Sequence, residues 1–331
     1  MRKPPQPGAN ALWLGFSEER IMQRRHPPNP GCFTQLRRTA PGGQAHWAVH
    51  TFSLVARDPD TGDLGIAVAS KFLAVGFVVP WAKAGVGALA TQSYVNPYFG
   101  PTGLALMEAG AGPEDILAVF ARNDPDLAKR QFGYVLASGE SLSYTGQECH
   151  AWAGSRWGPN YAAQGNLLTG PEVLEALEQT FLARSDLAFP ERLLEALLQA
   201  DRAGGDRRGR QSAALLVVGA GKGYGGMERW IDLRVDDHHD PVVELQRLLG
   251  IHRLLFGAGE PGRPLRTEEI AWIQALLGRQ GLYTGEASGV WDEATEKAFA
   301  TLIGMENLEE RYRGGPFLDE TVLKYLREKF A

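Results

Sequence analysis

The stretch that begins after residue 50 constrains the fold most. TFSLVARD at 51–58 and LGIAVASKF at 64–72 are short runs rich in aliphatic residues, and PDTGD at 59–63 connects them. Runs of this kind are typical of strands, and the Asp and Gly residues between them favour a turn. The sequence therefore predicts two strands joined by a hairpin-like connection, with Thr51 as the first strand residue.

The first fifty residues differ sharply from the rest of the chain. They contain seven prolines, and seven Lys or Arg against only Glu18 and Glu19. Their apolar run ALWLGF is too brief for the core of a signal peptide or for a membrane helix. We expect 1–50 to be disordered and dispensable for folding. A removable leader, a translation start assigned too far upstream and an inert tail are the three interpretations that the sequence leaves open.

Blocks of strand and helix patterns come after Thr51. Further strands are expected at 77–92, 131–138, 140–146, 210–220 and 229–237. Helices are expected at 101–112, 112–124, 170–185, 189–205 and 240–257, where Leu and Phe recur at spacings of three and four in the longer segments. Strand groups, a helix group, more strands and a closing helix predict an α+β fold, a four-layer αββα sandwich over 51–256.

A second unit begins after a Gly/Pro-rich stretch, GAGEPGRPLR, at 257–266. This stretch lacks periodicity and predicts a linker that separates two folded parts. Residues 267–331 carry amphipathic patterns for a small three-helix module. Its expected core consists of Trp272, Leu276, Trp291, Phe299 and Leu302. A module of this size is small for a catalytic core but large enough for a helical binding domain.

Charge and cysteine content narrow the function classes. The net charge of −5 gives no general reason to expect nucleic acid as a partner, since phosphate binding needs clustered Lys and Arg. Cys32 and Cys149 lie far apart without CxxC spacing, which supports neither a disulfide framework nor a thiolate zinc site. We expect a cytoplasmic protein with no cofactor, no metal and no membrane partner, and homo-oligomerisation is left open.

Two resemblances to known families add to these patterns. Residues 51–256 resemble an uncharacterised bacterial and archaeal domain-of-unknown-function family that is placed by fold in the N-terminal nucleophile (Ntn) hydrolase superfamily. The matching stretches are TFSLVARDPDTGDLGIAVASKFLAVGFVVPWAKAGVGALATQ, YTGQECHAWAG, YAAQGNLL, AGGDRRGRQSAALLVV and WIDLRVDDHHDP. Residues 267–331 are similar to peptidoglycan-binding-like domains appended to some members, through IAWIQALLGRQGLYTGEASGVWDEATEKAF. This second resemblance implies a peptidoglycan fragment or another glycan as partner.

The first resemblance implies a role for Thr51. An Ntn hydrolase attacks an amide carbonyl with the side chain of an N-terminal Thr, Ser or Cys, whose own α-amine takes the proton. That amine titrates near pH ~8, so it can act as a base without an imidazole. In this chain His50 precedes Thr51, so the His50–Thr51 bond would have to be cleaved. An ordinary threonine at a strand edge is the alternative interpretation.

Lysines are the first candidates for a supporting role. Lys71 and Lys83 lie in the sheet-forming region, where a cation would lower the pKa of the nucleophile and of its amine. Lys71 is favoured, because it ends the second strand beside the start of the first. Solvated lysines at sheet ends are the alternative for both.

The segment AGGDRRGRQS resembles the Asp/Ser/Gly segment that supports the nucleophile in proteasome-like Ntn hydrolases. This likeness implies Asp206 and Ser212 as residues that orient Thr51. The alternative is a helix stop and turn in which Asp206 pairs with Arg207 or Arg210.

The polar run ATQSYVNP offers substrate-binding or oxyanion donors in Thr91, Gln92 and Asn96, because side-chain amides stabilise developing charge without titrating. Alternatively, these side chains satisfy backbone groups where a strand turns into a helix.

Three other clusters carry less weight. DDHHD at 236–240 holds metal-ligand residue types, but consecutive strand residues point to opposite faces, and Asp240 fits better as a helix N-cap. GAGKGYGG at 219–226 lacks the Ser or Thr and the following helix of a phosphate loop, and is expected to be a hairpin. Cys149 precedes His150, but adjacency alone does not make a nucleophile and its base, so a structural thiol is expected.

Two function classes remain. The first is a hydrolase of C–N bonds, an Ntn-type amidohydrolase acting on a small amide or peptide that derives from cell-wall material. The second is a non-catalytic binding or scaffold protein that uses the same fold, with the C-terminal module binding glycan or another protein. The state of the His50–Thr51 bond discriminates the two classes.

Overall fold

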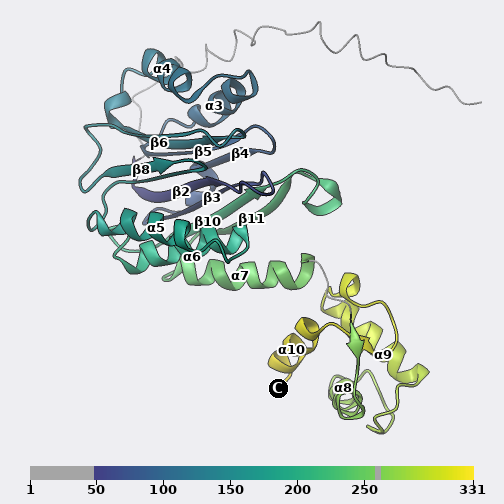
Figure 1. Ribbon diagram of the computed structural model, residues 1–331. Coiled ribbons are helices and arrows are strands. Elements are labelled where there is room, and N and C mark those ends of the chain that lie inside the picture. The colour runs from purple at the N-terminus through teal and green to yellow at the C-terminus, as the bar shows by residue number, and fades with distance from the viewer. Residues whose placement is uncertain (1–47, 258–261) are drawn as a thin grey trace, which may run out of the picture.

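The structure, a computed structural model, describes residues 48–257 and 262–331 (Figure 1). Two antiparallel sheets form the larger part. The first contains β1 (Ala48–Val49), β4 (Pro80–Lys83), β5 (Gly87–Tyr94), β6 (Arg130–Leu136) and β7 (Ser141–Thr145), in the order β1-β5-β6-β7 with β4 also paired to β5. The second contains β2 (Thr51–Arg57), β3 (Leu64–Ser70), β8 (Gly154–Gly158), β9 (Tyr161–Gly165), β10 (Ser212–Val218) and β11 (Arg229–Val235), in the order β11-β10-β3-β2-β9-β8.

Helices lie on the outer faces of both sheets (Figure 1). The first sheet is covered by α3 (Phe99–Glu108) and α4 (Pro113–Asn123), and the second by α5 (Glu172–Ala183), α6 (Phe189–Arg202) and α7 (Pro241–Phe256). Short helical turns connect other elements: α2 (Val75–Val78), η2 (Leu127–Lys129) and η3 (Tyr224–Gly226). The prediction of a mixed fold of sheets and helices is confirmed at this level.

Strand β2 shows why both faces of the second sheet are buried. Its side chains alternate, so Phe52 and Leu54 belong to the apolar cluster shared with α5 and α6, whereas Val55 belongs to the cluster between the two sheets. A third cluster, which includes Phe99, Phe120 and Phe132, joins the first sheet to α3 and α4. Three apolar layers therefore hold the sheets and helices together.

Most expected elements lie within a few residues of their predicted positions, but two differences stand out. Val78, expected in a strand, ends α2. Strands β8 and β9 were not predicted, because GSRWG and YAAQG are poor in β-branched residues and become strands through pairing with each other and with β2. Asp240 is the N-cap residue of α7, as expected, although its side chain makes no capping hydrogen bond.

The boundary of the N-terminal segment also differs from the prediction. Ala48 and Val49 form β1, paired with Tyr94 and Ser93 of β5, and His50 is buried. The prediction of disorder over 1–50 is therefore wrong for these three residues. The part of the segment before Ala48 lies outside the described residues.

The C-terminal module contains α8 (Thr267–Arg279), α9 (Glu293–Met305), η4 (Glu309–Arg311) and α10 (Glu320–Lys329), together with a strand pair, β12 (Arg263–Pro264) and β13 (Phe317–Leu318). Of the expected core residues, Leu276, Phe299 and Leu302 are buried, while Trp272 and Trp291 are partly buried against them. Leu254 of α7 and Leu265 belong to the same cluster. The core of the module therefore includes a residue before the 257–266 stretch and a residue within it, although that stretch was expected to be only a linker.

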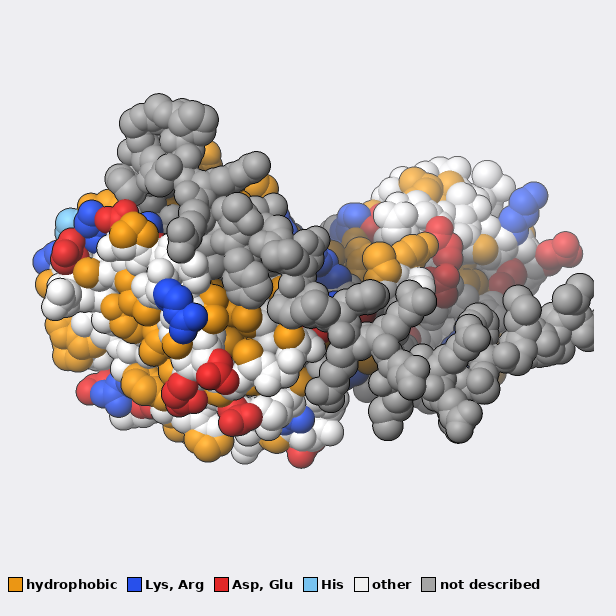
Figure 2. Space-filling model, turned by 90° about the horizontal axis from the view of Figure 1, so that it is seen from above, with side chains coloured by type: hydrophobic (Ala, Val, Ile, Leu, Met, Phe, Trp, Pro, Cys, Tyr) orange, Lys and Arg blue, Asp and Glu red, His pale blue; other side chains and the backbone are white. Residues whose placement is uncertain are grey.

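The exposed surface carries both charge signs. In the view of Figure 2, Lys and Arg are interspersed with Asp and Glu over the described surface that faces the viewer. Within the described ranges, no helix is long and apolar enough to cross a membrane.

Candidate active site

Thr51 lies in the layer between the two sheets. It is fully buried, and its Oγ1 has no hydrogen-bond partner among the described residues. Its cross-strand partner on β3 is Ser70, whose own partner on β10 is Ser212. Since directly opposite residues project from the same face of a sheet, these three hydroxyl-bearing residues form a row across β2, β3 and β10. A buried hydroxyl without a hydrogen-bond partner costs free energy, and such exceptions call for an explanation, which makes Thr51 the first residue to explain.

The peptide bond that precedes Thr51 is held by two donors. The carbonyl oxygen of His50 accepts a hydrogen bond from Ser70 Oγ at 2.6 Å and another from Arg208 Nη2 at 3.1 Å. Donors aimed at a carbonyl oxygen stabilise the negative charge that develops there when a nucleophile attacks the carbon. The hydroxyl nearest to this carbonyl along the chain belongs to Thr51, the next residue.

Asp206 holds Arg208 in place. Its carboxylate is 4% exposed and accepts from Arg208 Nη2 at 2.7 Å, from Arg208 Nε at 3.0 Å and from the Arg208 backbone N–H at 2.9 Å. The backbone N–H of Lys71 donates to the same carboxylate at 3.0 Å. Asp206 thus orients the cation that binds the His50 carbonyl.

The alternative prediction, in which Asp206 pairs with Arg207 or Arg210, is wrong. Arg207 donates instead to the carbonyl of Ala151, and Arg210 pairs with Asp201 at 2.8 Å. The difference arises in the loop after α6, where Gly204 (φ 124°) and Gly205 (φ 53°) adopt left-handed conformations and turn Asp206 back toward β3. Such a turn decides which of the neighbouring arginines can reach the carboxylate.

His50 is buried, and the groups around its ring, which include Asn166 and His150, are called the His50 pocket below. Its Nδ1 lies 2.6 Å from Asn166 Oδ1, and its ring meets that of His150 edge-on with centroids 4.7 Å apart. Tyr94 Oη lies 3.1 Å from His150 Nε2. Because an amide oxygen only accepts hydrogen bonds, His50 Nδ1 is the donor. Burial lowers the pKa of His50 below its ordinary value, although the hydrogen bond with Asn166 acts against it, and the neutral ring is therefore favoured.

Buried amides connect this pocket to Thr51. Gln92 Nε2 donates to the Thr51 carbonyl at 3.1 Å and to Gln131 Oε1 at 2.8 Å, and Asn166 Nδ2 donates to Gln131 Oε1 at 2.7 Å. Gln164 Nε2 donates to Ser53 Oγ at 2.6 Å. All four amide side chains are fully buried. Uncharged groups that satisfy one another can fix a polar layer inside a protein at lower cost than ions.

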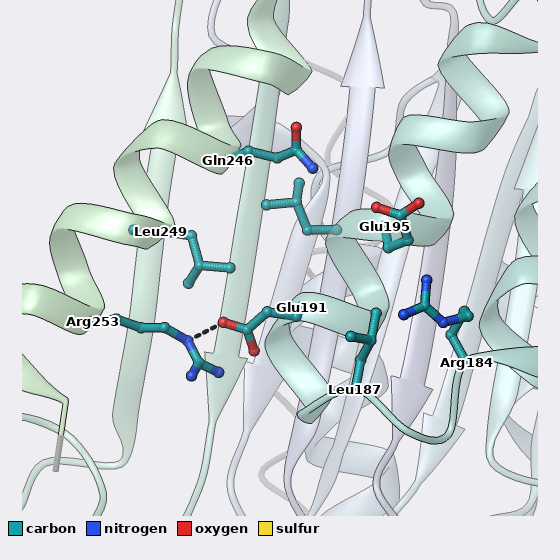
Figure 3. A pocket seen from close by; sticks show the side chains of 9 residues that line it. Arg184, Leu187, Glu191, Glu195, Gln246, Leu249 and Arg253 are labelled. Atoms are coloured by element: carbon teal, nitrogen blue, oxygen red, sulfur yellow. Dashed lines mark ion pairs between the residues drawn. The ribbon is translucent and has the colours of Figure 1, made fainter. Parts of the chain in front are cut away.

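Two surface cavities lie away from Thr51. One of about 360 Å³ is lined by residues from the α5–α6 connection, α6 and α7, including Arg184, Glu195 and the ion pair between Glu191 and Arg253 (Figure 3). Those helices cover the outer face of the second sheet, whereas Thr51 faces the inner layer. Another cavity, of about 520 Å³, lies beside Trp157 and Asn160. Neither cavity is lined by Thr51.

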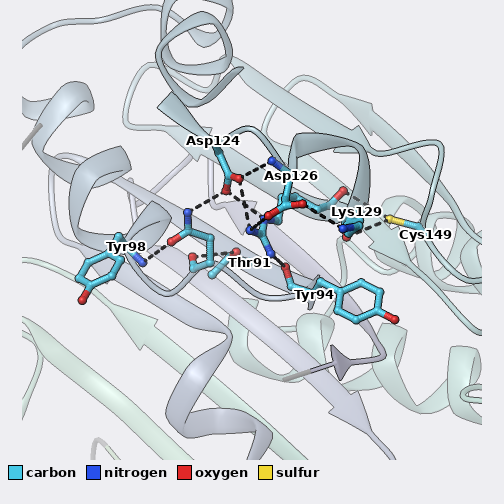
Figure 4. A network of polar contacts seen from close by, with 9 residues as sticks. Thr91, Tyr94, Tyr98, Asp124, Asp126, Lys129 and Cys149 are labelled. Carbon is cyan, nitrogen blue, oxygen red and sulfur yellow. Dashed lines mark hydrogen bonds and ion pairs between the residues drawn. The ribbon is translucent and has the colours of Figure 1, made fainter. Parts of the chain in front are cut away.

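Two of the three proposed substrate-binding residues lie away from Thr51. Thr91 and Gln92 are adjacent on β5 and therefore point to opposite faces. Thr91 Oγ1 donates to the Asn96 carbonyl at 3.4 Å, and Asn96 Nδ2 donates to Asp124 Oδ2 at 2.8 Å, in the network of Figure 4. In that network Asp124 also pairs with Arg130 at 2.9 Å. Of the three, only Gln92 contacts the residue expected to be the nucleophile.

The supporting candidates act at different points. The Lys71 ammonium is exposed and donates to the Arg210 carbonyl at 3.1 Å, so Lys71 contacts the site through its backbone N–H. Ser212 Oγ donates to the Phe72 carbonyl and accepts from the Val75 N–H, which secures the loop after β3. Lys83 pairs with exposed Glu108 on the surface.

The remaining clusters have structural contacts. Cys149 Sγ donates to the carbonyls of Lys129 and Arg130, and burial raises its pKa. His238 and His239 lie ring against ring. In the described part of the chain no group of three or more His, Cys, Asp or Glu could hold a metal ion. The Gly-rich 219–226 stretch connects β10 to β11, as the hairpin prediction required.

Sequence reasoning missed several of these residues. Ser70 could have been found, because the equal lengths of β2 and β3 and the short turn between them place it opposite Thr51. Arg208 could not be singled out, since it is one of three arginines at 207–210. Gln131, Gln164 and Asn166 lie far from Thr51 in sequence. The pairing of β9 with β2 brings Gln164 and Asn166 to it within one sheet, and the packing of the other sheet brings Gln131.

Comparisons with known proteins agree with this division of the chain. Residues 258–326 match a domain model described as "Putative peptidoglycan binding domain". The crystal structure of protein SPO2555 from Silicibacter pomeroyi, assigned to the DUF1028 family, is 32% identical, with a TM-score of 0.56, and the match covers 62% of this chain and 89% of that one. No curated protein matches the chain significantly. Residues 51–245 match the model of a family of unknown function, DUF1028, and the chain belongs to that family.

Proposed function

We propose that residues 51–256 form an amidohydrolase of the N-terminal nucleophile type, a four-layer αββα sandwich in which Thr51 attacks a small amide or peptide. Two facing sheets with helices on both outer faces support this architecture. The first residue of β2, at the end of the inter-sheet layer, is the nucleophile. Its amine becomes available when the His50–Thr51 bond is cleaved.

One observation carries the proposal. The unpartnered, buried Oγ1 of Thr51 directly follows a carbonyl oxygen that accepts from both Ser70 and Arg208. An ordinary threonine at a strand edge needs neither a buried orphan hydroxyl nor a guanidinium on the preceding carbonyl. Both features are useful to a chain that cleaves this bond.

The cleavage balances without a cofactor. Thr51 Oγ1 attacks the His50 carbonyl carbon, the C–N bond breaks, and the hydroxyl proton ends on the released amine of Thr51. Water then hydrolyses the ester between His50 and Thr51, which restores the hydroxyl. The free amine, with a pKa near ~8, serves as the base for later substrates.

The other residues have positioning roles in this scheme. Asp206 orients Arg208, and the Lys71 backbone N–H helps to fix Asp206. Ser212 holds the loop that follows Ser70 and Lys71. Gln92 binds the Thr51 carbonyl. Thr91 and Asn96 stay outside the site.

The C-terminal module supplies binding rather than chemistry. Its match to a peptidoglycan-binding model supports a cell-wall glycan or glycopeptide fragment as its ligand. A substrate amide derived from the same material would then be delivered to Thr51. In the alternative, non-catalytic function, the His50–Thr51 bond stays intact, and binding by this module is the activity of the protein.

Intact mass and N-terminal sequencing of the purified full chain test the proposal. We expect a chain that begins at Thr51, whereas Thr51→Ala retains residue 50. A chain that remains uncleaved and yet hydrolyses amides, or Thr51→Ala with full activity, would contradict the assignment. Co-sedimentation with purified peptidoglycan, compared between the full chain and a chain ending at Gly257, tests the module separately.

A further inference from the structure

Residues 48–50 lie where the acyl side of a substrate has to lie. In the proposed function Thr51 attacks the carbonyl of His50, so every group that contacts residues 48–50 contacts the acyl side of the attacked bond. Ala48 and Val49 pair with Tyr94 and Ser93 as an added antiparallel strand. When this segment leaves, the edge of β5 is exposed to an incoming strand.

The two side chains nearest the bond occupy different environments. Val49 is fully buried in the apolar cluster between the sheets. The neutral imidazole of His50 lies edge-on to His150 and donates to Asn166 Oδ1. The vacated site thus offers an apolar subsite followed by a flat subsite with one buried acceptor.

We propose that this segment marks the acyl-side groove, and that the substrate is a short peptide or N-acyl peptide amide that adds as a strand to β5. A branched apolar residue fills the Val49 position, and a neutral, planar, hydrogen-bond-donating residue fills the His50 position. The carbonyl of that second residue binds Ser70 and Arg208 and is attacked by Thr51. This inference rests on the proposed function.

The charges around the groove explain the selectivity. Arg208 lies near the His50 position and disfavours a second cation, and its own charge is already paired with the Asp206 carboxylate at 2.7 Å. An acidic residue would meet the acceptor Asn166 Oδ1 instead of a donor and would lose its hydration. A phenyl ring fits the shape but leaves Asn166 Oδ1 unpaired. The expected order of preference is therefore imidazole, then phenyl, then carboxylate.

Hydrolysis of a matched set of p-nitroanilides tests this order. The full chain, verified to begin at Thr51, is assayed with acetyl-Ala-Val-His-, acetyl-Ala-Val-Phe-, acetyl-Ala-Val-Asp- and acetyl-Ala-Asp-His-p-nitroanilide. We expect kcat/KM for the first to exceed that of either Asp-containing probe by at least about tenfold, as a buried unpaired polar group requires. The Phe probe should fall between them.

A variant assigns the preference to one contact. Asn166→Ala removes the acceptor, so the ratio of kcat/KM between the His and Phe probes should fall toward one. The Phe probe serves as the internal standard, because a general loss of structure lowers kcat/KM for both probes and leaves their ratio unchanged. Asn123→Ala, which removes an amide bound to the Val119 carbonyl at the end of α4, is the matched control and should keep the wild-type ratio.

The outcomes separate the two proposals. Equal hydrolysis of the His and Asp probes, or an unchanged ratio in Asn166→Ala, overturns the groove assignment while leaving Thr51 as nucleophile. No hydrolysis of any probe by a chain that begins at Thr51 overturns the groove assignment, and a chain that never loses residue 50 overturns the proposed function as well. If Asn166→Ala does not fold, the comparison of the four probes with the wild-type chain still tests the groove assignment.

Discussion

Asp206 and Arg208, which are only two positions apart in the sequence, form an ion pair with 2.7 Å between Oδ2 and Nη2. The pair lies in a loop that two left-handed glycines turn toward the start of β2. Arg208 uses the same Nη2 to reach the carbonyl oxygen of His50 at 3.1 Å. A local loop conformation therefore places a fixed cation on the peptide bond that precedes Thr51.

Thr51 variants separate chemistry from stability. Thr51→Val keeps the volume of the side chain and removes a hydroxyl that makes no hydrogen bond within the described residues, so the free energy of unfolding should change by less than about 1 kcal/mol or rise. Cleavage at His50–Thr51 should vanish in Thr51→Val and Thr51→Ala and persist in part in Thr51→Ser. Mass spectrometry and urea unfolding measure the two effects. A strongly destabilised Thr51→Val would show that the hydroxyl has a structural partner.

Removal of either carbonyl donor should slow cleavage. Ser70→Ala and Arg208→Gln each remove one hydrogen bond to the His50 carbonyl, and loss of a single oxyanion donor typically costs about 10²–10³ in rate. Time-resolved mass spectrometry of freshly translated chain measures the rate. Arg207→Gln makes the same change of charge one residue away, at a side chain that donates to Ala151, and should cleave at the wild-type rate.

Lys71→Met tests whether the ammonium takes part. The side chain is exposed and donates to the Arg210 carbonyl, while the contact with Asp206 comes from the backbone N–H, which the variant keeps. We expect the cleavage rate to change less than about tenfold, well below the effect of an oxyanion donor. A loss comparable to that of Arg208→Gln would return Lys71 to a direct role.

The buried amide network should contribute strongly to stability. Gln131→Leu leaves donors on Gln92 and Asn166 without their shared acceptor, so we expect a loss of at least about 2 kcal/mol in the free energy of unfolding. Gln199→Leu makes the same substitution on α6, where the amide contacts Glu195, and should cost less than about 1 kcal/mol. Urea denaturation compares them, and equal losses would mean that the network is not tightly coupled.

Acid should destabilise the C-terminal module through Glu269. Its carboxylate is fully buried, and a hydrogen bond from Arg263 at 2.7 Å, followed by those from Arg266, lowers its pKa below the ordinary value of about 4.3. A carboxyl whose pKa is lower in the folded state stabilises it above the unfolded pKa, and the contribution is lost as the pH falls through the folded pKa.

Glu269→Gln should therefore lower the thermal midpoint of the module at pH 7, and the gap to the wild type should narrow below about pH 4. Exposed Glu268, which pairs with Arg266 at 3.2 Å, provides the matched control, and Glu268→Gln should differ little from the wild type at either pH. A gap for Glu269→Gln that stays constant from pH 7 to pH 3 would contradict this account.

Local patterns in the amino-acid sequence were enough to specify the elements that depend on periodicity alone. Alternating aliphatic runs and an Asp/Gly turn specify β2 and β3, and spacings of three and four specify α5 and α6, because these periodicities match the repeat of a strand or a helix. The same reasoning placed Thr51 at the start of β2, whereas Gln92 was proposed, with Thr91 and Asn96, as a substrate-binding donor from its residue type alone. It also separated a helical C-terminal module from the rest.

Which side chains meet depends on the packing of the whole fold. Nothing local distinguishes Arg208 from Arg207 or Arg210, and only the turn at Gly204 and Gly205 selects the one that reaches both Asp206 and the His50 carbonyl. Thr91 and Gln92 are adjacent polar residues, and the sequence gives no reason to prefer either as a site residue. On β5 they project from opposite faces and therefore lie in different layers. The pocket of His50 and the amide network depend on contacts between residues more than thirty positions apart. Strand pairing within each sheet, such as Gln92 opposite Gln131, and the packing of the two sheets set these contacts together, because neither can be read from a local pattern.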